Sequence, residues 1–419
     1  MHLLKAQPGG FVDEEGIIDL EQTPAPIVVL SAADSSLAAL AQAVEALPAD
    51  FPDVRLANWM QLLKPAAFDL YRDKVLDKAQ VIVVSLLGGS SYWQYGAEML
   101  EEWLKAARPN RPRHLIVVSG DDSVDPELDA LSSLDSEGVH RVWRYLREGG
   151  FANSQQLFRY LGAECLGHDS VWQEPQSLPR CMLYLPNSKY AQASFSEWQI
   201  RWKNNGNTTP TDSSTASNSN EPNSFIATNV CVVLFYRSHL QSGNTRMFDQ
   251  LIERLEAHGL HPLPIAVASL KDPESITLVN ALIEQSDAKL ILNTTGFASN
   301  TVASPDLSAE PTHFKSPFAR NIPVLQLILS GSTQDDWESY TQGLRSRDIA
   351  MQVVLPEMDG RIITRAISFK AESRWSERAQ ISVISYQLHR ERADFIAQLS
   401  RNYLRLTLKP NPQKRIALI

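Results

Sequence analysis

Short apolar runs alternate along this chain with longer stretches in which apolar positions recur at helical spacing. The most pronounced run, 230–235, is apolar throughout and is followed at once by Tyr236, Arg237, Ser238 and His239. A continuous apolar run bounded by turn residues is typical of a strand buried on both faces. Such strands occur in parallel sheets that helices cover on both sides. The pattern therefore predicts an α/β protein.

Strand and helix patterns alternate in two separate regions. The strands predicted for the first region are 27–30, 54–57, 81–87 and 115–118. Those predicted for the second region are 230–235, 264–268, 289–292 and 324–329. Alternation of this kind indicates parallel strands joined by crossover helices. We expect two doubly wound domains of the Rossmann or flavodoxin type, with mostly parallel sheets.

The domain limits follow from changes in composition. Residues 204–224 are rich in Asn, Ser and Thr, so they bury too little apolar surface to fold and are predicted to be a disordered loop or linker. An N-terminal α/β domain is expected at 1–203 and a second one at 225–345. Residues 346–419 are expected to begin a third, body domain.

The expected body domain consists of a hairpin, a long helix and a strand. The hairpin would join strands 351–355 and 361–369 through a turn that contains Asp359–Gly360, because Asp-Gly favours such turns. The helix is predicted at 376–404. The apolar run 414–419 looks like a strand at which the chain stops, which suggests a fragment of something longer.

Composition narrows the classes of function. The 419 residues carry a net charge of −9 and show no basic stripe, which argues against a nucleic-acid partner. No apolar run reaches 18 residues, and the N-terminus lacks the features of a signal peptide. The three cysteines, Cys165, Cys181 and Cys231, are scattered, which fits a reducing compartment. We therefore expect a cytoplasmic protein without a membrane span.

Candidate site residues follow two strands of the second region, because ligands of open α/β sheets bind beyond the carboxyl ends of the strands. Arg237 is predicted either to contact an anionic ligand or to form a structural salt bridge with a nearby Asp or Glu. His239 either contacts a ligand, by donating a hydrogen bond, carrying a proton or handing over a metal ion, or is a hydrogen-bonded structural histidine. Ser242 and Asn244 form a turn and helix cap, or bind a ligand through helix amides.

Asn293 and Thr294 follow the strand at 289–292 and are the remaining candidates. They would line the same cleft or satisfy the backbone of their own loop. After the strand at 81–87, Tyr92 and Trp93 are predicted to pack in the core rather than to stack on a ligand, since their helix has core spacing. The chain contains no GxxxxGK[ST], so no phosphate-binding P-loop is expected.

Several longer segments resemble the large subunit of aerobic cobaltochelatase, the CobN family, and more distantly the H subunit of magnesium chelatase. The matching segments are LANWMQLLKPAAFDLY (56–71), LLGGSSYWQYGAEML (86–100), GDDSVDPEL (120–128), LFYRSHLQSGNTRMFDQLIERLEAHGL (234–260), ASLKDPES (268–275), LNTTGFA (292–298), RDIAMQVVLPEMDGRIITRAISFK (347–370) and KRIALI (414–419). Together they are specific, and apart from 204–224 they span essentially the whole chain.

The resemblance implies ATP-dependent insertion of cobalt(II), as substrate, into hydrogenobyrinic acid a,c-diamide during cobalamin synthesis. In this family the large subunit binds the corrin, while partner AAA+ subunits use ATP and Mg²⁺, which this chain would not bind. The family's chelation signature, His-x-Gly-Thr-His-Gly-x-Leu-Glu, is absent here. No catalytic residue is therefore assigned, and we expect the 419 residues alone to be inactive.

Three alternatives stay open from the sequence. The first is a magnesium chelatase subunit that acts on protoporphyrin IX. The second is a non-catalytic tetrapyrrole-binding or assembly module. The third is a periplasmic-type binder with two α/β lobes, against which the missing signal peptide argues.

Overall fold

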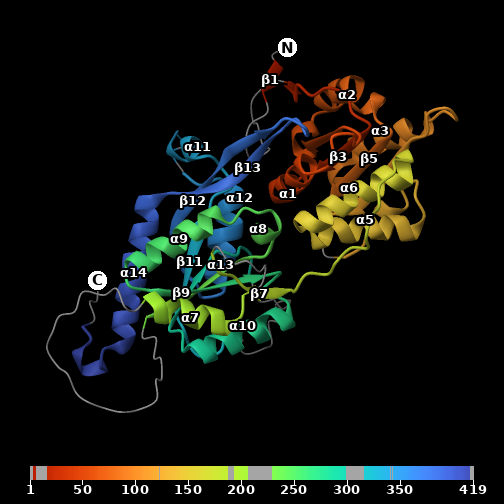
Figure 1. Cartoon of the computed structure of the whole chain (residues 1–419). Helices are drawn as coiled ribbons and strands as arrows, with labels where there is room; N and C mark the ends of the chain where they lie inside the picture. Colours follow the sequence, from red (N-terminus) through yellow and green to blue (C-terminus); the bar gives the residue numbers. More distant parts are fainter. Residues whose placement is uncertain are drawn as a thin grey trace, which may run out of the picture.

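Buried apolar strands form two separate sheets in the computed structural model, each inside its own α/β unit (Figure 1). The structure describes residues 3–5, 17–121, 123–186, 193–205, 229–298, 316–339, 341 and 343–415. The predicted linker at 204–224 and the predicted strand at 414–419 lie almost entirely outside these residues. A small parallel pair, β1 (Leu3–Lys5) and β2 (Ile17–Asp19), precedes the first unit.

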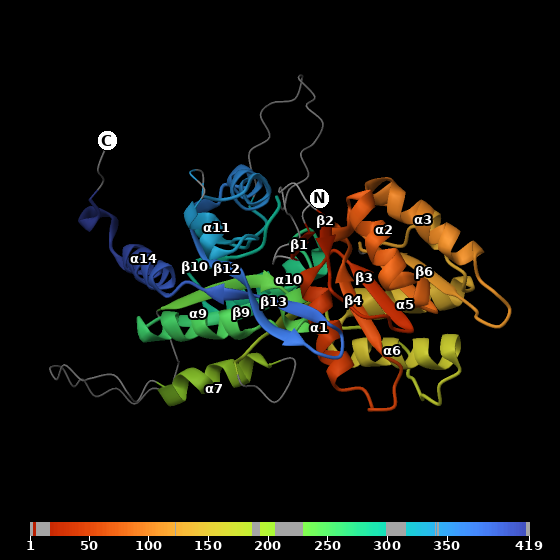
Figure 2. The same cartoon turned by 90° about the horizontal axis from the view of Figure 1, so that it is seen from above.

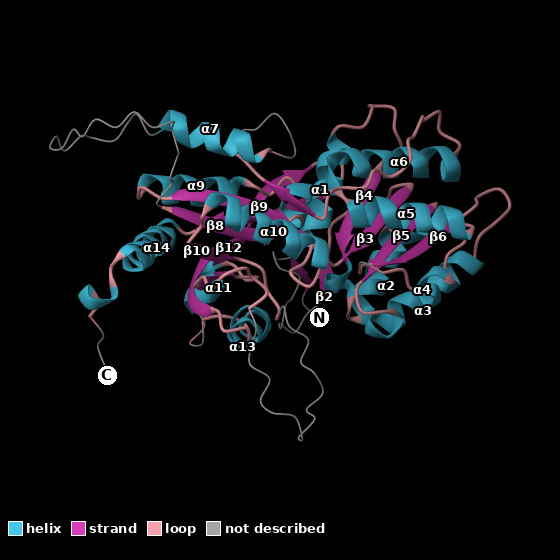
Figure 3. Ribbon diagram, turned by 90° about the horizontal axis from the view of Figure 1, so that it is seen from below, coloured by secondary structure: helices cyan, strands magenta, loops and turns pink. Residues whose placement is uncertain are grey.

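The first sheet has four parallel strands in the order β4-β3-β5-β6. Its strands are β3 (Ile27–Ser31), β4 (Val54–Asn58), β5 (Val81–Leu86) and β6 (His114–Ser119). Its helices are α1 (Asp34–Glu45), α2 (Pro65–Lys74), α3 (Gln94–Lys105), α4 (Pro126–Asp129), α5 (Ser136–Glu148) and α6 (Gly150–Leu166). Helices α1, α5 and α6 cover one face, and α2, α3 and α4 cover the other (Figure 3).

The second sheet has seven strands in the order β13-β12-β11-β10-β8-β9-β7. Its five central strands are parallel: β8 (Val230–Tyr236), β9 (His261–Val267), β10 (Leu290–Asn293), β11 (Val324–Leu329) and β12 (Ile362–Ser376). Two antiparallel edge strands flank them: β7 (Cys181–Leu183) and β13 (Ile381–Leu388). In chain order the central strands run 2-1-3-4-5, the flavodoxin order.

Helices cover both faces of this sheet as well. The longer ones are α7 (Phe195–Asn205), α9 (Arg246–Ala257), α10 (Pro273–Ser286) and α14 (Arg390–Leu408). The short ones are α8 (Ser238–Gln241), α11 (Gln334–Ser339), α12 (Ser346–Ile349) and α13 (Leu355–Met358). Helices α9 and α14 pack on one face, and α7 and α10 on the other. The predicted α/β class with mostly parallel sheets is therefore confirmed.

Two elements predicted for the last part of the chain are wrong. The segment expected as a strand at 351–355 is helical, with a π-helical turn at Ala350–Val354 that runs into α13. The Gln352 side chain fixes this turn, because its Oε1 accepts from Leu329 N at 2.8 Å. The helix expected at 376–404 begins only at Arg390, since the preceding residues form β13.

The hairpin is β12–β13, and it belongs to the second sheet rather than to a separate unit. Strand β7 also pairs with β9 of that sheet, although it lies within the range expected for the first domain. The grouping of strands therefore differs from the expected limits at 203 and 345. This grouping depends on which strands pair. Strands that are far apart in the chain can pair without leaving any signal in the local sequence pattern.

The tip of the β12–β13 hairpin leaves its own sheet and lies on the first unit (Figure 2). Leu56 N in β4 donates to Ala379 O in the hairpin turn at 3.3 Å. Arg378 Nη2 donates to Pro48 O at 3.0 Å, and Ser376 Oγ donates to Glu45 Oε1 at 2.6 Å. The hairpin therefore covers the outer edge of β4 and fixes the two units together.

Candidate functional site

The carboxyl edges of the two sheets meet at one junction. Helix α1 begins just beyond the carboxyl end of β3, and α8 begins just beyond that of β8; these two helices are in contact. Lys370, at the carboxyl end of the second sheet, donates its backbone N–H to Ser332 O at 3.0 Å. Its Nζ lies 2.5 Å from Asp34 Oδ2 at the start of α1. Ligands of open α/β sheets bind beyond such edges, so this junction is the candidate site.

Arg237 is buried at the end of β8 and is held by the first unit. Its Nη1 donates to Leu178 O at 3.0 Å and to Pro179 O at 3.3 Å. The same nitrogen lies 3.8 Å from Glu148 Oε2 at the end of α5. Glu148 in turn accepts from Leu178 N at 3.1 Å. Of the two interpretations from the sequence, these contacts match the structural ion pair.

His239 is buried in α8 between the two units. Its ring lies edge-on to Phe248, with 4.9 Å between ring centroids, and to Tyr386, with 5.6 Å. Nδ1 has no hydrogen-bond partner within the described part of the chain. Burial, and to a lesser degree the charge of Lys370, lowers the pKa of His239 to about 4. The imidazole is therefore neutral at pH 7 and keeps a nitrogen that can accept a proton or a hydrogen bond.

Lys370 and Tyr386 also lie at the junction, close to each other. The Lys370 ammonium lies 6.0 Å from the centre of the Tyr386 ring. Burial alone would lower the pKa of Lys370, but Tyr386 and Asp34 together raise it. Burial raises the pKa of Tyr386, although Lys370 opposes this effect. At neutral pH the junction thus holds a charged Lys370–Asp34 pair beside a neutral imidazole and phenol.

Ser242 and Asn244 form the turn that leads from α8 into α9. Ser242 Oγ donates to His239 O at 3.2 Å, and Asn244 N donates to the same oxygen at 2.9 Å. Gly243, between them, has a φ of 67°, a backbone conformation that suits glycine. These contacts attach the turn to the backbone of His239, and α9 begins directly after it at Arg246.

Asn293 and Thr294 lie in a different, fully enclosed network at the end of β10. Asn293 Nδ2 donates to Gln326 Oε1 at 2.7 Å and to Thr295 O at 3.0 Å. Thr294 Oγ1 donates to Leu234 O at 2.8 Å. Arg361 closes the network, because its Nη1 donates to Gln326 Oε1 at 3.2 Å. The polar side-chain atoms of Asn293 and Thr294 thus form hydrogen bonds within the protein. This arrangement matches the interpretation in which they satisfy the backbone of their own loop.

Phe297 lies in the same loop and was not predicted as a site residue. Its φ is 63°, which is unusual for a residue with a bulky side chain, and half of the residue is exposed. Its N–H donates to Met351 O at 2.8 Å, so the π-helical turn at Ala350–Val354 holds this conformation. An exposed aromatic ring held in a strained backbone beside a π-helical turn is a feature associated with functional sites.

The structure thus brings Arg237, His239, Ser242 and Asn244 together at the junction, and Asn293 and Thr294 in a neighbouring buried network. Sequence analysis missed Asp34, Lys370, Tyr386 and Phe297. The position of Asp34 after a predicted strand was a usable signal; Lys370 and Tyr386 had none.

Among the described residues, no three His, Cys, Asp or Glu side chains are grouped so that they could hold a metal ion. No described helix combines the length and apolar character that a membrane span requires.

Comparison with known proteins identifies the family. The model of the CobN/Magnesium Chelatase family matches residues 143–419, well over half of the chain. The chain belongs to this family. Within the CobN/magnesium chelatase family, it is 46% identical over all 419 residues to the aerobic cobaltochelatase subunit CobN of Pseudomonas aeruginosa, of which it covers 31%. It is 36% identical over the same length to the CobN subunit of a Sinorhizobium species, again covering 31%.

A solved structure and a further sequence relative belong to the same family. The catalytic subunit of cobaltochelatase from Mycobacterium tuberculosis matches 93% of this chain with a TM-score of 0.56 and 25% identity, and the match covers 28% of that protein. The rice magnesium-chelatase subunit ChlH is 29% identical over 131 residues, which is 30% of this chain. The chain therefore spans less than a third of the CobN relatives that it matches.

Proposed function

We propose that this chain is the N-terminal portion of the corrin-binding subunit of an ATP-dependent aerobic cobaltochelatase. Such an enzyme inserts Co²⁺, its substrate, into hydrogenobyrinic acid a,c-diamide during cobalamin synthesis. The observation that carries the proposal is the 46% identity to a CobN subunit over the entire chain. The matches to magnesium-chelatase subunits are weaker, with 29% identity over 30% of the chain in one case and 25% identity over 45% in another.

In this proposal the chain contributes to substrate binding, and residues elsewhere in the longer subunit carry out metal insertion. The ATP-hydrolysing step, with its Mg²⁺, belongs to partner AAA+ subunits. The junction supports a binding role because His239 Nδ1 is unpartnered within the described residues. Asn244, half-buried in the turn beside it, is the second candidate for direct contact. Arg237, Ser242, Asn293 and Thr294 are proposed to act indirectly, by holding the loops in place.

Titration with two tetrapyrroles tests the proposal. Hydrogenobyrinic acid a,c-diamide and protoporphyrin IX are each added to the chain, and quenching of tryptophan fluorescence is followed to saturation. The proposal predicts tighter binding of the corrin than of the porphyrin. A preference for the porphyrin would overturn the cobalt assignment and favour a magnesium chelatase subunit.

A chelation assay separates the binding module from the complete enzyme. The 419-residue chain is mixed with the corrin, Co²⁺, ATP and AAA+ partner subunits, and the visible spectrum of the cobalt corrin is recorded. No cobalt corrin should form with the chain alone, whereas the complete large subunit that contains this segment should form it. Insertion by the chain alone would contradict the expected location of the metal-inserting residues.

A further inference from the structure

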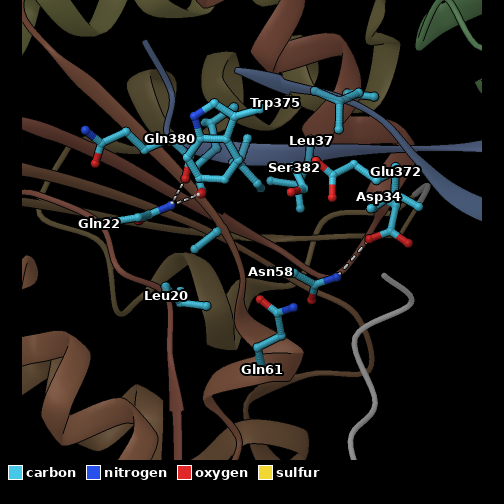
Figure 4. A pocket seen from close by; sticks show the side chains of 16 residues that line it. Leu20, Gln22, Asp34, Leu37, Asn58, Gln61, Glu372, Trp375, Gln380 and Ser382 are labelled. Carbon is cyan, nitrogen blue, oxygen red and sulfur yellow. Dashed lines mark hydrogen bonds between the residues drawn. The ribbon is translucent and has the colours of Figure 1, made fainter. Parts of the chain in front are cut away.

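The two units enclose a pocket where the β12–β13 hairpin crosses α1 and β4. Figure 4 shows it from close by: the first unit and the hairpin each supply one wall. The enclosed part of the pocket is small, about 80 Å³, and the pocket is open to solvent on one side. On the first-unit side, the apolar lining residues are Leu20, Leu37, Ala38, Leu56 and Ala57, and of these only Leu20 is partly exposed. A cavity of this size holds a few water molecules, so it can admit one small head group while the rest of a ligand lies at the opening.

The polar walls of the pocket are fixed in place. Gln22 Nε2 donates to Leu56 O at 2.8 Å and to Gln380 O at 2.7 Å, which ties the first unit to the hairpin. Asn58 Nδ2 donates to Asp34 Oδ1 at 3.0 Å, and the other Asp34 oxygen is paired with Lys370. The charge of Asp34 is therefore already balanced, and the walls are rigid before any ligand arrives.

A β-bulge places Glu372 and Trp375 on the same face of the hairpin. Glu372 lies opposite Ile384, and Trp375 lies opposite Ser382. Since Ser382 and Ile384 are two residues apart on β13, they point to one face, and so do their partners. In a regular strand, residues three apart point to opposite faces. The shift in register between Glu372 and Arg374 inserts the extra residue, and bulges often re-aim side chains beside functional sites.

Both side chains line the pocket, and neither one forms an ion pair or a ring contact with another described residue. Glu372 is exposed and forms no ion pair with any described residue. Trp375 is 45% exposed, and its ring contacts no other aromatic ring or cation in the described part of the chain. In the view of Figure 4 they flank Ser382 at the rim of the pocket. The bulge thus presents a carboxylate beside an indole, with apolar side chains below.

We propose that this pocket binds an organic cation, an alkyl-ammonium or alkyl-guanidinium group. The indole attracts the cation through its π face, and the Glu372 carboxylate supplies the opposite charge. The alkyl stem would lie along Leu20, Ile381 and Ile384, the partly exposed apolar residues of the lining, as the stems of Lys and Arg do on apolar surfaces. The group belongs either to a small molecule or to a basic side chain of a partner protein. This inference does not rest on chelatase function.

Binding of butylguanidinium, measured by titration calorimetry on the 419-residue chain, tests the proposal. Butylurea has nearly the same shape without the charge and serves as the matched ligand. We expect saturable one-to-one binding of butylguanidinium and at least fivefold weaker binding of butylurea. Equal affinity for the two, or no saturable binding of butylguanidinium, would overturn the proposal.

Variants then locate the site. Glu372→Gln should weaken binding about fivefold and Trp375→Leu about threefold to fivefold, from the usual strengths of a partly exposed ion pair and a cation–π contact. Glu377→Gln, an exposed carboxylate in the same hairpin outside the pocket lining, should leave affinity unchanged. Equal loss in the Glu372 and Glu377 variants would show a general charge effect and refute the pocket.

A second ligand distinguishes a basic side chain of a partner protein from a small organic cation. The peptide acetyl-Gly-Arg-Gly-amide presents the same guanidinium on a protein backbone. Binding at least tenfold tighter than that of butylguanidinium, and sensitive to Glu372→Gln, would assign the pocket to a basic side chain of a partner. Equal or weaker binding of the peptide would assign it to a small organic cation.

Discussion

Lys370 Nζ lies 2.5 Å from Asp34 Oδ2, and this contact joins residues that are 336 positions apart in the chain. Lys370 belongs to the second sheet, and Asp34 begins the first helix of the other unit. The side chains of both are largely buried, with 20% and 13% of their surface exposed. The pair therefore acts as a direct electrostatic link between the units at the candidate site.

A double-mutant cycle should measure this link. Lys370→Met and Asp34→Asn are each expected to lower the free energy of unfolding by about 2 kcal/mol, because each leaves a buried charge without its partner. The double variant should lose about 1–2 kcal/mol less than the sum of the two. Urea denaturation gives all four values. Strict additivity would show that the pair contributes no coupling.

Arg237 is expected to stabilise the fold. Its guanidinium holds the backbone of Leu178 and Pro179 and faces Glu148, so Arg237→Ala should cost about 3 kcal/mol of unfolding free energy. Arg246→Ala, at an exposed position in the next helix, should change it by less than about 0.5 kcal/mol. Unchanged stability of Arg237→Ala together with lost tetrapyrrole binding would instead assign Arg237 to the ligand.

His239 should make stability depend on pH. Its pKa is about 4 in the folded protein, whereas an unfolded chain has a histidine pKa of about 6.5. The unfolded state therefore binds more protons, and stability is lost as the pH falls through the window from 6.5 to 4. Between pH 7 and pH 5 this loss amounts to about 2 kcal/mol.

The variant His239→Gln isolates this contribution. Its free energy of unfolding should fall about 2 kcal/mol less between pH 7 and pH 5 than that of the unmodified chain. His140→Gln, at an exposed position, serves as the control and should keep the original pH dependence. Parallel pH profiles for the unmodified chain and His239→Gln would contradict a buried, neutral imidazole.

Phe297 should show opposite effects on stability and binding. Replacing it with Gly removes the strain of a φ of 63° and should raise the free energy of unfolding by about 0.5–1 kcal/mol. If the exposed ring contacts the proposed tetrapyrrole, the same change weakens binding severalfold. A destabilised Phe297→Gly would show that the ring supports the fold, and both quantities are measured on one preparation by urea denaturation and fluorescence titration.

The sequence predicted the strands well because their signal is local. Apolar runs such as 230–235 and 324–329 are long enough to identify β8 and β11 without their partners. The strand ends that carry Arg237 and Asn293 were located for the same reason. What the local pattern could not supply was the partner of each side chain. Arg237 pairs with Glu148 of another unit, and no spacing in the sequence brings these two residues together.

The hairpin shows why the last part of the chain was harder. Residues 362–376 mix charged and apolar side chains, and residues 381–388 mix uncharged polar and apolar ones, because one part of the hairpin lies in the second sheet and the other covers the first unit. A strand with two such environments loses the regular alternation by which strands are recognised. The helical pattern expected from 376 onward was present only from Arg390.

The order in which ribosomes make this chain gives the hairpin a further consequence. The first unit is synthesised early, but Leu56 N, on the outer edge of its sheet, finds its partner only when Ala379 has emerged. Until then β4 presents an open edge, the kind of surface on which unrelated strands pair. The first unit is therefore complete in sequence long before the edge of β4 is covered. The topology of the fold thus requires that this edge be protected during translation.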